Sequence, residues 1–305
     1  MKFTYPRLLG ALLAPLLAAG QPAAASVDIR FDYRYDSSNF FTGANSSRQN
    51  ILDAAASVFE TRFQDSLTAI TSSGSNRFDA NFFRPDNGSL FSIPAYSVDA
   101  DQIVVFAGAR NLGRTLATGG PGGFTGSGSA DFLDNAAGRG QPGVLLPVET
   151  DFGRWGGSLS FNSASSNWYF DPDTDTDESF SGFDFYSVAV HELAHVLGFG
   201  SADSFNNLSS GGLFTGSAVN ALLGSNPSLT KEGHWVSGLS YSGQEAAMDP
   251  TIAAGQRKHF TELDYAAMRD IGWEVSPVPE AETWALMLAG LGVLGWRVRG
   301  YGRGI

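Results

Sequence analysis

The distribution of apolar residues along the chain predicts a mixture of strands and helices. Residues 27–35 alternate between polar and apolar side chains, which is the period of a half-buried strand. After Ser46 and Ser47, apolar residues recur at helical spacing and predict an amphipathic helix. Its apolar face consists of Ile51, Leu52, Ala55, Val58, Phe59 and Phe63. Residues 103–106 form a short, wholly apolar run that is typical of a central strand.

Two further segments complete a predicted α+β fold. Residues 108–143 are rich in glycine, serine and proline, so we expect a long surface loop with little regular structure there. Residues 157–161 alternate again and predict a strand, which the pattern allows to be either an exposed edge strand or a buried hairpin strand. An edge strand would bind an extended peptide by β-augmentation. This order of elements indicates an α+β domain with a mixed, twisted sheet.

The clearest helix signal lies between Asp184 and Gly198. Asp184 is a favourable N-cap because its side chain can accept a hydrogen bond from the first turn. The apolar stripe of the helix consists of Val190, Leu193, Ala194 and Leu197. Gly198 follows the last of these residues and tolerates the positive φ with which many helices end.

This helix carries the sequence His191-Glu192-Leu193-Ala194-His195. Residues four apart lie one turn above each other, so His191 and His195 can bind one metal ion. Glu192 lies beside them, where its carboxylate can act as a general base toward a water on zinc. The alternative is a chance occurrence on an ordinary amphipathic helix, but two of the four histidines of the chain fall in this pentapeptide. The sequence therefore predicts a hydrolytic zinc site.

A cluster of acidic residues precedes this helix. Four of its carboxylates alternate with other residues, at Asp171, Asp173, Asp175 and Asp177. Alternating aspartates can supply oxygen ligands to Ca²⁺, although the pattern of an EF-hand is not met because its glycine and its final glutamate are missing. A solvated acidic loop is the alternative. The sequence leaves both interpretations open, with calcium as a candidate second metal.

Composition and the N-terminus indicate an exported globular protein, which we expect to be a monomer. The 305 residues carry a formal net charge of −12, which opposes binding to nucleic acid or to anionic membrane surfaces. Lys2 and Arg7 precede an apolar stretch at residues 8–19 and a run of alanines ending at Ala25, which predicts a signal peptide over residues 1–25. The absence of cysteine excludes disulfides, thiol catalysis and cysteine-ligated zinc.

The C-terminal residues 276–305 form a segment with its own composition. The pair Pro279-Glu280 is followed by a short apolar run at residues 284–296, for which we expect a helix, and by an arginine cluster. This order resembles the PEP-CTERM sorting signal, although Ala281 stands where that signal has its second proline. The resemblance implies a Gram-negative bacterial protein that only its tail holds in the inner membrane, until sorting machinery releases it to the cell surface or matrix. A terminal helix packed on the domain is the alternative, because a membrane span needs about 20 residues.

Three further motifs follow the zinc helix. They are the pair His234-Trp235, the tripeptide Met248-Asp249-Pro250, and a closing helical segment that ends in Asp270-Ile271-Gly272-Trp273. Together with the Leu-Gly-Phe after His195, this order resembles that of the leishmanolysin-like metzincins over residues 185–275. The resemblance implies a zinc endopeptidase with a zincin domain at residues 26–275. Its active-site helix would close an N-terminal part at residues 26–198, and a C-terminal subdomain would occupy residues 199–275.

A catalytic zinc ion usually has three protein ligands, so one ligand must come from outside the helix. Ser201, at the position of the third ligand in the short metzincin pattern, is a poor zinc ligand. The resemblance instead assigns the role to His234 and implies that Met248 lies beneath the metal. Asp203 and His259 are the alternatives. Asp203 lies two residues beyond the point where the short turn returns to the metal, and His259 follows two basic residues whose charges oppose a zinc ion.

These observations predict a secreted zinc-dependent endopeptidase that hydrolyses protein or peptide substrates. Zinc would polarise the peptide carbonyl and activate a water, while Glu192 would transfer the proton from the water to the leaving amine. Two alternatives stay open. One is a non-catalytic surface or matrix protein that binds calcium and a structural zinc, which would need four closed ligands. The other is a zinc hydrolase of non-peptide amides.

Overall fold

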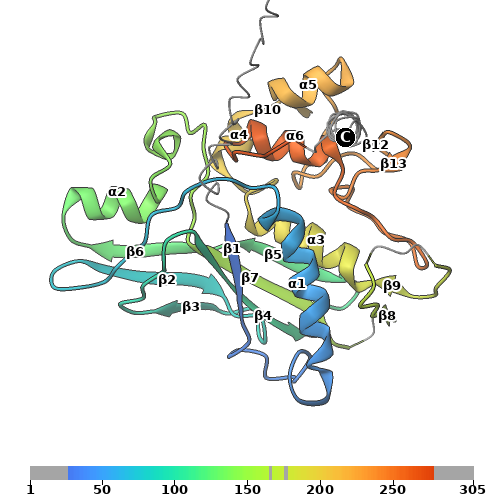
Figure 1. Ribbon diagram of the computed structural model, residues 1–305, viewed down its shortest axis with the longest axis horizontal. Coiled ribbons are helices and arrows are strands. Elements are labelled where there is room, and N and C mark those ends of the chain that lie inside the picture. Colours follow the sequence, from blue (N-terminus) through green and yellow to red (C-terminus); the bar gives the residue numbers. More distant parts are fainter. Residues whose placement is uncertain (1–26, 165–166, 175–177, 278–305) are drawn as a thin grey trace, which may run out of the picture.

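A four-stranded sheet forms the centre of the computed structural model, which describes residues 27–164, 167–174 and 178–277. Its strands, in the order β1-β4-β7-β5, are β1 (Asp28–Asp32), β4 (Gln102–Arg110), β7 (Gly156–Asn162) and β5 (Ala117–Pro121). The first three strands run parallel, and β5 pairs antiparallel with β7. Helices α1 (Ser47–Glu60) and α3 (Phe185–Val196) contact each other and pack on the sheet (Figure 1).

Strand β4 is buried on both faces, which explains its uninterrupted apolar run. Ile103 and Val105 belong to the hydrophobic core that also contains the buried residues of α1 and α3. Val104 and Phe106, at the alternate positions, belong to a second core beneath a second sheet. The second sheet has the order β3-β2-β6 and consists of β3 (Leu90–Ile93), β2 (Arg77–Phe83) and β6 (Gly123–Ser127). The predicted central strand is therefore confirmed, and it separates two cores.

The first predicted strand and helix are also confirmed. The strand ends earlier than predicted, since β1 covers five residues within the alternating segment at 27–35. The face predicted for α1 packs into the main core, with Val58 half-buried and the other predicted residues, including Phe63 just beyond the helix, buried.

The prediction of a long irregular loop at residues 108–143 is wrong. This segment contains β5, β6 and helix α2 (Ala130–Gly138). Its glycines allow close packing that a side chain would prevent. A Cβ at Gly119 would collide with the carbonyl oxygen of Glu192, and a Cβ at Gly122 would collide with the indole ring of Trp155. High glycine content here reflects strands pressed against a helix and a tryptophan, and not a loop.

The segment at residues 157–161 forms a strand as predicted, but it is not the edge of the sheet. Strand β7 lies between β4 and β5, and it is buried almost throughout. The edge-strand interpretation is therefore wrong for this segment. The edge next to α3 is provided by β5, which the glycine-rich composition had concealed.

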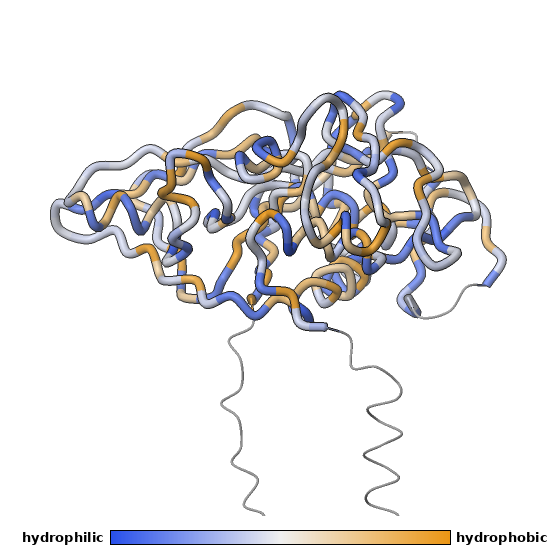
Figure 2. Tube along the Cα trace, turned by 90° about the horizontal axis from the view of Figure 1, so that it is seen from above, coloured by the Kyte–Doolittle hydropathy of each residue, from blue (hydrophilic) through white to orange (hydrophobic). Residues whose placement is uncertain are grey.

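The remaining elements are short. They are the 3-10 helices Gly43–Asn45 and Pro142–Leu145, the strands β8 (Trp168–Tyr169), β9 (Phe183–Asp184), β10 (Ser209–Ser210), β11 (Leu213–Phe214), β12 (Ser240–Tyr241) and β13 (Gln244–Glu245), and the helices α4 (Asp203–Asn207), α5 (Ser217–Leu223) and α6 (Glu262–Asp270). Helices α4, α5 and α6 lie together beyond α3 (Figure 1). Seen from above, hydrophobic stretches run through the body of the molecule and hydrophilic stretches are frequent along its outer loops (Figure 2). The molecule is thus of mixed α and β composition, compatible with the predicted α+β class.

Candidate metal centre

Helix α3 is built as its sequence predicts. The side chain of Asp184 accepts a hydrogen bond from the backbone N–H of Ser187 (3.1 Å), which makes Asp184 the N-cap. The predicted apolar stripe is fully buried. Gly198 follows the end of the helix with a φ of +105°, and a Cβ at this position would lie 2.9 Å from the ring of Phe152. The helix therefore has fixed ends, and it presents His191 and His195 one turn apart.

Three histidine side chains converge beside α3. The Nε2 atom of His195 lies 3.1 Å from that of His191 and 2.9 Å from that of His234, and the Nε2 atoms of His191 and His234 are 3.1 Å apart. Zinc–nitrogen bonds of about 2.0–2.1 Å place tetrahedral ligands about 3.3 Å apart, which is close to these separations. In the part of the chain that the structure describes, no other group of metal-binding side chains lies this close together.

Hydrogen bonds from the opposite ring nitrogens fix the tautomers of two of these histidines. The Nδ1–H of His191 donates to the carbonyl oxygen of Ala247, and that of His195 donates to the carbonyl oxygen of Phe199, both at 2.8 Å. The Nε2 atom of each neutral ring then carries a lone pair and no proton. Lone pairs that face one another at 3 Å repel unless a cation lies between them. The donor set therefore fits a zinc ion.

Burial keeps the triad neutral, which is the state that binds a metal. Burial lowers the pKa of His195 to about 4 and the pKa of His191 well below its usual value, and the neighbouring histidines act in the same direction. The pKa of His234 is also lowered by burial, although the carboxylates of Glu232 and Asp249 oppose this shift. All three imidazoles are therefore available as neutral ligands near pH 7.

The structure brings His234 to the other two histidines and leaves the alternative ligands elsewhere. Asp203 is exposed in the first turn of α4. His259 precedes α6 and lies beside Tyr186, with 6.1 Å between the ring centroids. Neither belongs to the group of residues that could hold a metal ion in the described part of the chain.

His234 reaches the centre through a contact between two glycines. A Cβ at Gly200, just after α3, would lie 2.7 Å from the carbonyl oxygen of Gly233, and both residues have positive φ. This close approach of two backbones holds the segment that contains His234 against the segment that follows α3.

Glu192 is buried beside the triad, with 8% of its surface exposed. Burial raises the pKa of its carboxyl group to about 8, and a hydrogen bond from the backbone N–H of Gly119 partly opposes this shift. A cation held by the triad would also lower this pKa. A carboxyl group in this position could accept a proton from a water beside a metal ion held by the triad.

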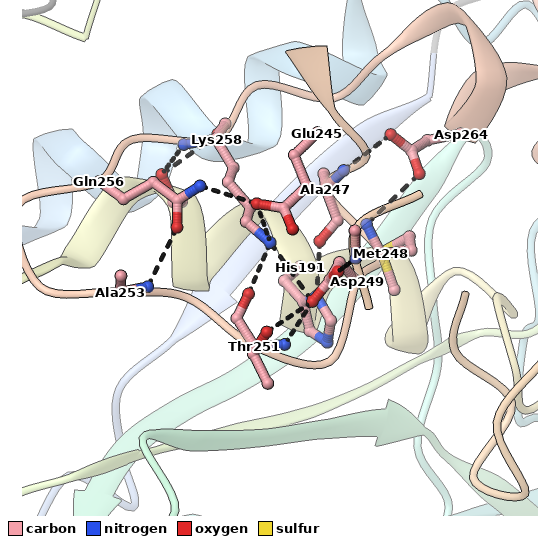
Figure 3. Close-up of polar contacts among 12 residues, drawn as sticks. His191, Glu245, Ala247, Met248, Asp249, Thr251, Ala253, Gln256, Lys258 and Asp264 are labelled. Carbon is pink, nitrogen blue, oxygen red and sulfur yellow. Dashed lines mark hydrogen bonds and ion pairs between the residues drawn. The ribbon is translucent and has the colours of Figure 1, made fainter. Parts of the chain in front are cut away.

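Met248 is fully buried in the turn that supports the triad. Its neighbour Ala247 accepts the hydrogen bond of His191, and its own carbonyl oxygen accepts a hydrogen bond from the backbone N–H of Trp235 at 3.1 Å. Figure 3 shows this turn directly beside His191. The methionine thus lies in the layer that holds the histidines.

A cavity of about 860 Å³ opens over the triad and Glu192. Its walls include the segment 113–119, which leads into β5, and the segment 249–252 after the methionine. In the pairing of β5 with β7, the N–H of Asn162 donates to the carbonyl oxygen of Leu116 (2.8 Å), and the N–H of Gly122 donates to that of Gly156 (2.7 Å). The backbone groups of the odd-numbered residues of β5 therefore point away from β7. Strand β5 has no other strand partner in the described residues, so its free edge borders the cavity.

The structure gives part of the acidic cluster an ion-pair partner. Asp171 is buried and pairs with the Nη2 atom of Arg257 at 3.1 Å, and Arg257 also pairs with the helix cap Asp184 at 3.1 Å. The Nη1 atom of Arg257 donates to the backbone carbonyl of Asp173 at 3.0 Å. Asp175 and Asp177 lie outside the described residues, so calcium binding remains a prediction.

Sequence reasoning missed two contributors to this site. The edge of β5 has no periodic apolar pattern, and its only signal is a run of glycines that loops share. Arg257 carries no motif, and its role follows only from the partners that folding brings to it.

The C-terminal tail matches a known sorting signal. Residues 277–300 match the PEP-CTERM protein-sorting motif. The predicted sorting signal is therefore confirmed, and the protein is exported and handled by a sorting system. No curated protein and no solved structure matches the chain. The predicted apolar helix of the tail and the predicted signal peptide lie outside the described residues, and no helix within the described ranges is long and apolar enough to cross a membrane.

Proposed function

We propose that this protein is an exported zinc-dependent endopeptidase related to the leishmanolysin-like metzincins. The observation that carries the proposal is the convergence of three neutral imidazoles beside a buried glutamate, at the floor of an open cavity. The order of the His-Trp pair, the Met-Asp-Pro turn and the closing helix after the zinc helix supports the relationship.

The residues around the cavity fit hydrolysis of an extended peptide. Apart from the N–H of Gly119, which donates to Glu192, the outer edge of β5 offers backbone groups to a substrate strand, which β-augmentation would hold across the triad. Zinc bound by the histidines supplies Lewis-acid polarisation of the scissile carbonyl and makes water more acidic. Glu192 accepts the proton of the attacking water and transfers it to the nitrogen of the leaving amine.

The number of ligands favours an open, catalytic site over a structural zinc site. Structural zinc sites have four protein ligands, whereas the described residues supply three histidines that face a cavity. A non-catalytic matrix protein would have no use for a buried carboxylate with a raised pKa beside the metal. Hydrolysis of non-peptide amides would use the same centre, and the free strand edge favours peptides over these substrates.

The proposal predicts the effect of Glu192→Gln. We expect the rate of casein hydrolysis to fall by at least about 10²-fold while one zinc ion stays bound, because the substitution removes the proton acceptor and no metal ligand. Casein cleavage and zinc content are measured on the same preparations, with and without a chelator.

Glu232→Gln is the matched control, since Glu232 lines the same cavity and the substitution makes the same chemical change. It should keep its activity within a few-fold of the original chain. Loss of zinc in Glu192→Gln, or activity close to that of the original chain, would refute the assigned role.

The sorting motif extends the proposal to location. We propose that the tail retains the protein in the inner membrane of a Gram-negative bacterium until sorting releases it to the cell surface or matrix. A fractionation experiment with and without residues 277–300 tests this, because the truncated chain should be secreted without an envelope-bound stage.

A further inference from the structure

The buried carboxylate of Asp264 lies where the elements that hold the metal centre meet. Its Oδ1 atom accepts hydrogen bonds from the indole N–H of Trp235 (2.9 Å) and the backbone N–H of Met248 (3.3 Å). Its Oδ2 atom accepts hydrogen bonds from the backbone N–H of Ala247 (3.0 Å) and from the backbone N–H and hydroxyl of Thr261 (2.9 and 2.7 Å). Figure 3 shows Asp264 with the turn at residues 247–248 between it and His191.

The first branch of this network leads to His191. Ala247 donates its N–H to Asp264 and accepts the Nδ1–H of His191 at its carbonyl oxygen. One residue thus transmits the position of the carboxylate to the acceptor that fixes the tautomer and orientation of a ligand. A second ring anchor of this kind is present at His195, through the carbonyl oxygen of Phe199.

The second branch leads to His234, whose ring has no hydrogen bond at Nδ1 like those of His191 and His195. Its Nδ1 atom is buried and makes no hydrogen bond within the described part of the chain. The adjacent Trp235 is instead fixed at two points, by the hydrogen bond from its backbone N–H to Met248 and by the hydrogen bond from its indole to Asp264. The indole is fully buried and packs against Phe199 with 5.1 Å between ring centroids. The backbone of His234 is itself held by Thr230, whose N–H donates to the carbonyl oxygen of His234 (2.8 Å) and whose hydroxyl accepts the N–H of His234 (3.2 Å). Trp235 is the next residue along the chain, so its two hydrogen bonds further restrict how His234 enters the centre.

We propose that Asp264 is a positioning residue of the metal centre, which holds two of the three histidines in the geometry of zinc ligands. The inference rests on the zinc site of the proposed function and not on peptide hydrolysis. The hydrogen bonds to Thr261 account for capping of α6, but the three bonds to Trp235, Ala247 and Met248 serve no capping purpose.

The substitution Asp264→Asn tests this role in the full chain. The amide places an N–H₂ group against donors in place of one oxygen, so one of the two branches loses its acceptor. We expect zinc affinity, measured by chelator competition, to fall about 10–100-fold, the range typical of residues that orient metal ligands. The visible absorption spectrum of the cobalt(II)-substituted protein should change as well, because the arrangement of ligand nitrogens changes.

Asp36→Asn is the matched control. Asp36 is also a buried carboxylate that accepts backbone N–H groups, from Phe40 (3.0 Å) and Phe41 (2.7 Å), in the loop before α1. The substitution Asp36→Asn should lower the melting temperature and leave zinc affinity within about twofold of that of the unsubstituted protein, because distant sites act independently. An Asp264→Asn protein that is less stable but binds zinc as tightly as the Asp36→Asn protein would show that Asp264 only caps a helix.

Trp235→Phe decides the question if Asp264→Asn does not fold. It removes the indole donor and keeps an aromatic ring, and zinc affinity should fall by about tenfold. Unchanged affinity in this variant overturns the inference. If the unsubstituted protein binds no zinc, both this inference and the proposed function are wrong. If the unsubstituted protein binds zinc but does not cleave peptides, only the proposed peptidase activity is wrong.

Discussion

At the scale of single residues, the histidines of the centre differ in how they are held. His191 and His195 share one helix and have carbonyl acceptors for their Nδ1 atoms, so their positions follow from α3 and two hydrogen bonds. His234 comes from a loop, and its position depends on the contact between Gly200 and Gly233 and on its neighbour. His234 is therefore the histidine of the triad whose position is most sensitive to packing.

The substitution His234→Ala should abolish tight zinc binding. We expect zinc affinity to fall by more than about 100-fold, because the substitution removes a ligand. Substitution of a residue that only orients a ligand typically lowers metal affinity by about 10–100-fold. Zinc content and chelator competition measure the effect. His259→Ala is the control, since His259 lies outside the triad, and it should keep a full complement of zinc. A stoichiometric zinc protein without His234 would contradict the assignment.

At the scale of elements, a buried arginine connects the acidic segment to the start of α3. Arg257 lies between Asp171 and the helix cap Asp184, with 2% of its side chain exposed. Two buried carboxylates near the start of a helix already have a cation between them, so the need for calcium there is reduced.

The substitution Arg257→Leu should therefore be strongly destabilising. Breaking a buried ion pair from one side costs about 3–5 kcal/mol, because the remaining charges are left without a partner. For a domain of this size, this loss lowers the melting temperature by roughly 6–20 °C. The control is Arg77→Leu, whose ion pair with Asp79 is exposed and should therefore contribute little to stability. A large stabilisation by millimolar Ca²⁺ in the original chain would instead favour a calcium site in the acidic segment.

At the scale of the whole molecule, the described fold closes just before the sorting motif. Val275 forms a β-bridge with Phe63, and the N–H of Ser276 donates to the carbonyl oxygen of Arg62 at 2.8 Å. These contacts return the chain to the end of α1 after the last helix. The described fold thus ends where the tail begins.

Truncation before Pro279 should leave a folded and active domain. We expect the melting temperature to stay within about 2 °C, which corresponds to less than about 1 kcal/mol for a domain of this size. Calorimetry and casein hydrolysis of the exported, truncated chain provide the measurement. Aggregation of the truncated chain would mean that the apolar run at residues 284–296 belongs to the core.

The sequence by itself determined the features that depend on neighbours along the chain. The spacing of His191, Glu192 and His195, the N-cap at Asp184 and the end at Gly198 are local, because a helix converts sequence spacing directly into distance. The apolar run of β4 likewise predicted burial on both faces. The sequence also predicted the sorting signal of the tail, because such a signal is recognised as a linear segment.

Only the tertiary structure decided which distant groups join these local features. It brought His234 to His195 across 39 positions, placed a glycine-rich strand at the edge of the cavity, and paired Arg257 with Asp171. Such contacts depend on how whole elements pack, and a glycine that permits close packing looks in sequence like a glycine in a loop. The helix therefore supplied two of the three histidines and Glu192 of the candidate site, and packing supplied His234 and the walls of the cavity.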